Sequence, residues 1–124
     1  GRKIYGLKHD DQIKAVMCFA FTNDVPKTVE ELDELSKDAY LQATHRAGVQ
    51  GSIAIAYTVW SLQKGGGKMI VDEVFKMIKQ SNHLNRLVTL SPLTDMAAKF
   101  HLRNGAKLIQ KNETTQNFEY LVKK

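Results

Sequence analysis

The sequence predicts one α/β (α+β) domain over residues 1–124, with a mixed, mostly antiparallel sheet flanked by helices. Three observations support this class. Short segments rich in β-branched and aromatic residues alternate with segments of helical periodicity. The first two predicted strands are separated only by a turn, and the last two form a hairpin. With 124 residues, the chain can build one hydrophobic core but has no room for two.

The predicted elements follow in the order β-β-α-β-α-β-α-β-β. Strands are predicted over residues 3–8, 13–21, 52–60, 87–90, 107–111 and 118–122, and helices over residues 28–48, 68–80 and 94–103. Turns join the first strand pair at 9–12 and the last pair at 113–117.

The first helix follows a strand that suits the centre of a sheet, because residues 16–21 are all apolar. Residues 23–26 then break that strand. Thr28, with Glu31 three residues later, forms a capping box that begins the helix, and Gly48 ends it. The apolar stripe of this helix comprises Leu32, Leu35, Ala39 and Ala43.

The second half of the chain alternates strands and shorter helices. Residues 52–60 (SIAIAYTVW) are rich in β-branched and aromatic residues, as a strand requires. The third helix closes at Asn104-Gly105, a favourable C-terminal cap. The apolar face of the second helix comprises Ile70, Val71, Val74, Phe75, Met77 and Ile78.

Composition excludes several classes of protein. The chain is 43% hydrophobic and 25% charged, as ordinary globular proteins are, so extended disorder is not expected. It has no apolar run of membrane-spanning length and no secretory signal pattern. The lone Cys18 excludes an internal disulfide and favours a reducing, cytoplasmic location.

The net charge of +5 favours anionic partners. Lys and Arg are scattered, however, with no basic helix and no basic stripe interleaved with aromatic residues, so nucleic-acid binding is not expected. His9, His45 and His83 lie far apart, without Cys or carboxylate partners at ligand spacing. The sequence therefore predicts no metal site.

Three consecutive glycines within residues 62–70 (LQKGGGKMI) lie between the third predicted strand and the second helix. Backbone N–H groups at a helix start form an anion site, and glycine lets a pyrophosphate approach closely. A Walker loop is excluded, because Leu62 and Met69 stand where it needs Gly and Ser or Thr. A dinucleotide fingerprint is excluded, because Ile70 stands at its third glycine.

The stretch resembles instead the acyl-CoA pyrophosphate loop of the Gcn5-related N-acetyltransferase (GNAT) fold, Arg or Gln-x-x-Gly-x-Gly or Ala before a helix. Gly65 and Gly67 match its two small positions. The leading Arg or Gln position falls on Leu62, one residue before Gln63. A plain flexible loop is the alternative interpretation of such a turn.

Residues 94–106 (TDMAAKFHLRNGA) extend the resemblance. They are similar to the family's helix Asn-x-x-Ala-x-x-Leu-Tyr-x-x-x-Gly-Phe, with Ala97, Phe100 and Gly105 in register. His101 stands at the Tyr position, which in that family often reprotonates the CoA thiolate. The closing hairpin also matches.

Within the same fold, two segments resemble the catalytic domain of malonyl-CoA decarboxylase. Residues 90–92 (LSP) and 100–106 (FHLRNGA) are similar to its LSP and FHLxNGA segments. Its catalytic serine and histidine fall on Ser91 and His101. That family has a separate helical domain, for which this chain has no room, so the likeness is compatible with ancestry as well as with retained chemistry.

The resemblance to the GNAT fold runs from residue 3 to the C-terminus. The usual first strand and the helices after it are missing, and a helix is inserted between residues 21 and 52. We interpret Gly1 as a cloning remnant and expect the domain to be N-terminally incomplete. Much of the acceptor site usually lies in the missing part.

The resemblance implies an acyl-CoA-binding protein that uses acetyl-CoA or another acyl-CoA as cosubstrate. It implies N-acyl transfer to an unknown acceptor, with malonyl-CoA decarboxylase-like chemistry or an inactive CoA-binding module as alternatives. A homodimer is compatible with it. The predicted catalytic residues are His101 and Ser91, and the predicted CoA contacts are Tyr57, Thr58, Val59, Lys64, Gly65, Gly66, Gly67, Lys68 and Met69.

Each candidate also has a simpler structural interpretation. His101 suits a hydrogen-bonded, half-buried position on an amphipathic helix. Ser91 before Pro92 is a common way to end a strand. Tyr57 and Trp60 at strand positions are suited to core packing as well as to a ligand groove.

Overall fold

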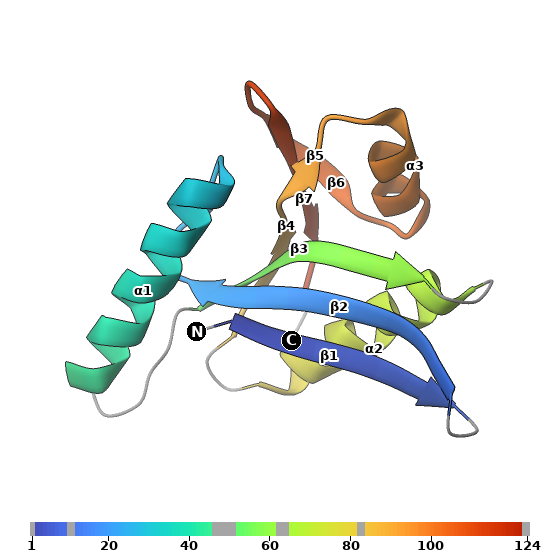
Figure 1. Cartoon of the computed structure of the whole chain (residues 1–124), viewed down its shortest axis with the longest axis horizontal. Helices are drawn as coiled ribbons and strands as arrows, with labels where there is room; N and C mark the ends of the chain where they lie inside the picture. Colours follow the sequence, from blue (N-terminus) through green and yellow to red (C-terminus); the bar gives the residue numbers. More distant parts are fainter. Residues whose placement is uncertain (1, 10–11, 46–51, 62–64, 82–83, 123–124) are drawn as a thin grey trace.

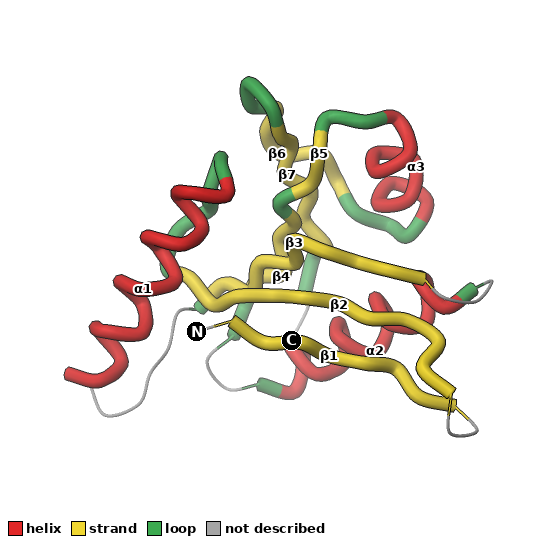
Figure 2. Tube along the Cα trace, in the orientation of Figure 1, coloured by secondary structure: helices red, strands yellow, loops and turns green. Residues whose placement is uncertain are grey.

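The protein, seen here as a computed structural model, is built on a sheet of seven strands (Figures 1 and 2). The structure describes residues 2–9, 12–45, 52–61, 65–81 and 84–122. The elements are β1 (Arg2–His9), β2 (Gln12–Thr22), α1 (Val29–His45), β3 (Ile53–Ser61), α2 (Gly66–Gln80), β4 (Arg86–Thr89), β5 (Ser91–Pro92), α3 (Asp95–Arg103), β6 (Lys107–Lys111) and β7 (Thr115–Tyr120).

The strand order is β1-β2-β3-β4-β7-β5, with β6 paired to β7. In this described part of the chain, β3 and β4 pair in parallel and the other strand pairs are antiparallel. This confirms the predicted mixed, mostly antiparallel α+β class. None of the described helices is long and apolar enough to cross a membrane.

Helices cover the two faces of the sheet at different places. On one face, α2 buries Ile70, Val74 and Ile78 against Met17 and Phe19 of β2. On the other face, Leu32 of α1 is fully buried in a smaller cluster that includes Ile53, Ile55 and Val88. The side chains of Ala39 and Ala43, and the predicted helix end at Gly48, lie outside the described residues.

Two of the three helices begin at side-chain caps. The Thr28 hydroxyl accepts a hydrogen bond from the Glu31 N–H at 3.0 Å, as the capping box predicts. The Thr94 hydroxyl accepts from the Ala97 N–H at 3.2 Å. At the other end of α3, Gly105 takes a φ of 96°, which confirms the predicted glycine stop.

The start of α2 was predicted wrongly by two residues. The helix begins at Gly66 rather than Lys68, after Gly65, whose φ of 82° lies in the left-handed region. Gly65 thus turns the chain, and Gly66 and Gly67 already lie in the helix. Glycine's poor helix propensity, which favoured a later start, is outweighed because both residues are buried there.

The last strand was also misplaced. It runs over Thr115–Tyr120 rather than 118–122, so the hairpin turn is shorter than predicted. The reason is a run of buried polar residues: Gln116 and Asn117 are 3% and 0% exposed. An apolar run is the usual sign of a strand, so the polar residues 115–117 were predicted to lie in the turn. The predicted strand 87–90 corresponds to β4 at Arg86–Thr89, and the short β5 at Ser91–Pro92 follows it beyond the predicted range.

Candidate functional site

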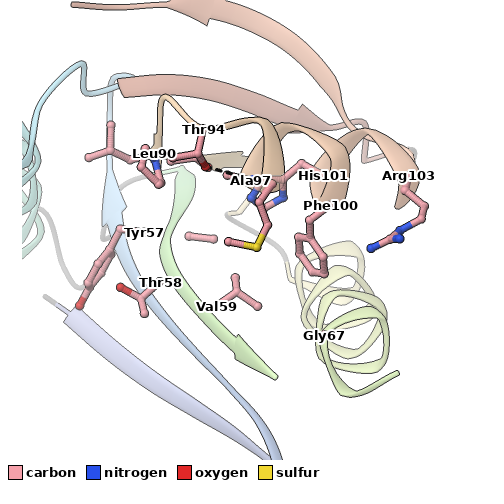
Figure 3. Close-up of a pocket in the computed structure, with 14 residues that line it drawn as sticks. Tyr57, Thr58, Val59, Gly67, Leu90, Thr94, Ala97, Phe100, His101 and Arg103 are labelled. Atoms are coloured by element: carbon pink, nitrogen blue, oxygen red, sulfur yellow. Dashed lines mark hydrogen bonds between the residues drawn. The ribbon is translucent and has the colours of Figure 1, made fainter. Parts of the chain in front are cut away.

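A cavity of about 560 Å³ lies between β3, the start of α2, β5 and α3 (Figure 3). Six predicted site residues line it, from four separate elements. The lining residues are Ala56, Tyr57, Thr58, Val59, Gly67, Leu90, Ser91, Pro92, Thr94, Met96, Ala97, Phe100, His101 and Arg103.

The cavity exists because β3 and β4 diverge. Their pairing ends at Ala56 and Thr89, where the Leu90 N–H donates to the Ala56 carbonyl at 2.9 Å. The chain then enters β5, which pairs with β7 instead. The strands on either side of the glycine stretch therefore splay apart beyond these two residues.

A β-bulge marks the same point on β3. Across the β2–β3 pair, Phe19 opposes Ala56 and Cys18 opposes Thr58, which leaves Tyr57 as the extra residue. The bulge shifts the alternation of side chains, since Tyr57 packs on the α1 side whereas both Ala56 and Val59 pack on the α2 side. Tyr57, Thr58 and Val59 thereby all border the cavity.

The N-terminus of α2 meets the cavity at Gly67, which is buried. Of the predicted CoA contacts in this stretch, Gly65, Gly66, Lys68 and Met69 do not line the cavity. The Met69 N–H donates to the Gly65 carbonyl at 3.1 Å, so it belongs to the first helical turn. Lys68 is exposed, and Lys64 lies outside the described residues.

His101 is 6% exposed and borders the cavity from α3. Its Nδ1 lies 2.7 Å from the hydroxyl of Tyr120 on β7, and the rings of Phe100, Phe118 and Tyr120 surround the imidazole. Burial lowers the pKa of His101 to about 4. The imidazole is therefore neutral at neutral pH, because desolvation disfavours its charged form.

The tautomer of His101 follows from its partner. Burial, and secondarily Asp72, raises the pKa of Tyr120, so its phenol keeps its proton. We assign the phenol O–H as the donor to Nδ1 in this 2.7 Å contact, the arrangement in which Nδ1 is the acceptor. The proton of the neutral imidazole then lies on Nε2. Every buried side-chain N or O atom among the described residues has a hydrogen-bond partner. Nε2 has no recorded partner, so this atom must retain some solvent-accessible surface.

Ser91 borders the same cavity from β5 and is 5% exposed. Its hydroxyl donates to the Thr89 Oγ1 at 2.9 Å, and that oxygen also accepts the Phe118 N–H at 3.0 Å. No hydrogen bond joins Ser91 to His101 in the described structure. The two residues predicted as a catalytic pair thus share one cavity without forming a nucleophile–base couple.

Sequence reasoning missed Tyr120, which fixes the imidazole, and Arg103, which borders the cavity. A signal for Tyr120 existed, since Phe118 and Tyr120 alternate on one strand and both are buried. Nothing in the sequence indicated which histidine such a tyrosine would meet, because that contact joins separate elements.

No family model matches this chain, and no curated protein matches it in sequence. Solved structures do. One is the GphF GNAT-like decarboxylase in complex with isobutyryl-CoA, with TM-score 0.71 and 10% identity over 97% of this chain and 78% of that one. Another is the N-acetyltransferase PseH from Campylobacter jejuni, with TM-score 0.64 and 14% identity over 97% and 67%.

A third match is malonyl-CoA decarboxylase from Cupriavidus metallidurans, with TM-score 0.72 and 14% identity. It covers 97% of this chain but 52% of that protein, so this chain spans about half of it. Identities this low establish the fold alone. The chain has the GNAT fold, which N-acetyltransferases and decarboxylases share.

Proposed function

We propose that the cavity binds a CoA thioester and that the protein acts on its acyl group. The observation that supports this best is the divergence of β3 and β4 beside a helix that begins with glycines. A pantetheine arm is a narrow chain with amide groups, and it can lie along the β3 backbone around residues 57–59 as an added strand. The diphosphate then reaches the positive end of the α2 dipole.

In this proposal, the thioester lies near His101, which borders the same cavity. A neutral imidazole with its proton on Nε2 is a hydrogen-bond donor, so it can stabilise an oxyanion at the thioester carbonyl. This replaces the predicted general acid with an electrophilic role. The Ser91 hydroxyl can rotate from Thr89 towards a second acyl oxygen.

Decarboxylation of a β-carboxyl acyl-CoA makes the smallest demand on these groups. The bond between the carboxylate carbon and the α-carbon breaks, CO₂ leaves, and the electron pair forms the enolate of the thioester. Nε2–H stabilises that enolate oxygen, and a water proton then completes the α-carbon. None of these steps requires a protein base.

Acetyl-CoA-dependent N-acyl transfer, the activity implied first by the sequence, is the second candidate. The amine must lose a proton as it attacks the carbonyl, and the CoA thiolate takes a proton as it leaves. No Asp or Glu is among the described residues that line the cavity, and the lowered pKa makes His101 a weak base. We therefore place decarboxylation first. An inactive CoA-binding module, a cytoplasmic location and a homodimer stay open proposals.

The test begins with mass spectrometry of the purified protein for a bound CoA species, followed by assays of CO₂ release from malonyl-CoA and of thiol release from acetyl-CoA with amines. We expect His101→Ala to lower turnover about 100-fold or more while CoA affinity barely changes, because an oxyanion donor acts in the transition state. Lys99→Ala, at an exposed position of the same helix that does not line the cavity, is the control and should keep its activity.

Ser91→Ala separates the two reactions. Decarboxylation should collapse, since the hydroxyl orients the departing carboxylate, whereas transfer to an amine should fall only modestly. Binding of acetyl-CoA without turnover of any acceptor or of malonyl-CoA would instead establish the inactive module. Absence of binding to any CoA thioester would refute the proposal.

A further inference from the structure

Arg103 is the one Lys, Arg, Asp or Glu side chain among the described residues that line the cavity. It is exposed, and no ion pair to another described residue is recorded for it. Arg86 offers a contrast, because its guanidinium forms a two-pronged ion pair with Glu119 at 2.8 and 2.9 Å. The guanidinium of Arg103 therefore retains its donors for a ligand.

The position of Arg103 tells which part of a ligand it can meet. It is the last residue of α3, and Figure 3 shows it beyond Phe100, towards the end of the cavity where Gly67 lies in the first turn of α2. Leu90 and Thr94 lie at the other end. His101 and Ser91 are 6% and 5% exposed, whereas Arg103 is exposed. The proposed acyl chemistry thus lies in the buried part of the cavity, and Arg103 lies at a solvent-exposed end, here called the entrance.

Two sources of positive potential converge at this entrance from separate elements. One is the guanidinium, and the other is the N-terminus of α2, whose first turn carries no acidic residue. No carboxylate in the described lining opposes them. The entrance is therefore suited to a group of high negative charge, whereas the remaining lining is largely apolar.

We propose that Arg103 binds a phosphate group of the CoA nucleotide and makes the site selective for CoA thioesters over phosphate-free thioesters. This inference rests on the proposed function. The planar guanidinium can hold two phosphate oxygens at once, which gives geometry as well as charge. Either the diphosphate or the 3′-phosphate supplies this chemistry, and a ligand series distinguishes them.

A structural role for Arg103 would be different. A cation in the last turn of a helix stabilises the helix dipole, and this effect would change stability but not ligand preference. Lys99 provides the matched control. It carries the same charge on the same helix, is exposed, and does not line the cavity.

The experiment titrates acetyl-CoA, acetyl-3′-dephospho-CoA and acetyl-pantetheine into wild type, Arg103→Ala, Arg103→Lys and Lys99→Ala by calorimetry, with thermal melts to verify folding. We expect Arg103→Ala to weaken acetyl-CoA binding roughly 10- to 100-fold, the range for a hydrogen bond between charged groups. Arg103→Lys should restore part of the affinity, and Lys99→Ala should bind as wild type does.

The ligands assign the phosphate. If Arg103→Ala binds acetyl-3′-dephospho-CoA as tightly as wild type does, Arg103 contacts the 3′-phosphate. If the loss of affinity persists with acetyl-3′-dephospho-CoA but disappears with acetyl-pantetheine, Arg103 contacts the diphosphate. The inference is overturned if Arg103→Ala loses as much affinity for acetyl-pantetheine as for acetyl-CoA, or if it binds acetyl-CoA as tightly as wild type does. Either result leaves the proposed function intact. Failure of the wild type to bind any of the three ligands overturns both.

Discussion

At the scale of single residues, burial decides what His101 can do. The imidazole is enclosed by three aromatic rings. It carries no positive charge at neutral pH, because burial lowers its pKa to about 4. Its position in the sequence suggested the residue that reprotonates the CoA thiolate. Desolvation cannot be read from a sequence, since it depends on Phe118 and Tyr120 from a strand that lies nearly twenty residues further along the chain.

His101 also makes stability depend on pH. The unfolded chain binds a proton at its ordinary pKa of 6.5, whereas the folded protein binds it only near 4. Stability is therefore full above pH 6.5 and falls as the pH decreases towards 4. Between pH 7 and 5, we expect a loss of about 2 kcal/mol in unfolding free energy from this residue.

Urea unfolding of wild type and His101→Gln at several pH values measures this loss. The variant has no imidazole at this position, so its stability should change less over the same interval. Parallel curves for the two proteins would contradict the assigned burial.

At the scale of elements, the start of α2 carries the glycine stretch. Gly67 is buried, borders the cavity and lies in the first turn, whereas Lys68 points outward as an exposed residue. Gly67→Val would place a branched side chain where the diphosphate is proposed to approach. We expect it to weaken CoA binding more than Lys68→Ala does, since Lys68 can add charge but no shape.

Isothermal titration of both variants with acetyl-CoA compares the contribution of close approach at Gly67 with that of the positive charge of Lys68. Gly67→Ala is the appropriate companion, because a methyl group tests space with less disturbance of the helix. Equal losses for Gly67→Val and Lys68→Ala would show that charge rather than close approach governs this end of the site.

Elements whose signals are local were predicted well. Thr28, Thr94 and Gly105 mark helix ends in the sequence and do so in the structure. The errors occur where tertiary contacts override a local preference, as at Gly66 within α2 and at Asn117 within β7. The cavity itself was anticipated only through the resemblance to a fold, because strand divergence leaves no mark in local periodicity.

At the scale of the whole molecule, Asn117 joins distant parts of the chain. It is fully buried, and its amide donates to the Thr89 carbonyl at 2.8 Å and to the Pro26 carbonyl at 3.0 Å. Its carbonyl oxygen accepts from Asn112 at 2.9 Å. One side chain thus connects the loop before α1, the end of β4 and the last hairpin.

Asn117→Leu keeps the volume but leaves the carbonyls of Thr89 and Pro26 without this donor. We expect a loss of roughly 2–5 kcal/mol in unfolding free energy, because buried polar groups would lose their partners. Chemical denaturation checks the value. Gln110→Ala, which removes a longer 3.4 Å contact to the same Asn117 oxygen, should cost far less, and a similar cost would refute the importance of the buried amide.

The place of β7 has a consequence for how the protein is made. Although it is the last strand, β7 lies inside the sheet, where it pairs with β4, β5 and β6, and it supplies Tyr120 to His101. During synthesis on the ribosome, the N-terminal hairpin and α2 can emerge and begin to pack, but the cavity wall has no support until β7 emerges. Binding competence therefore cannot appear before β7 has been synthesised, and chains terminated before β7 carry the glycine stretch without a complete site.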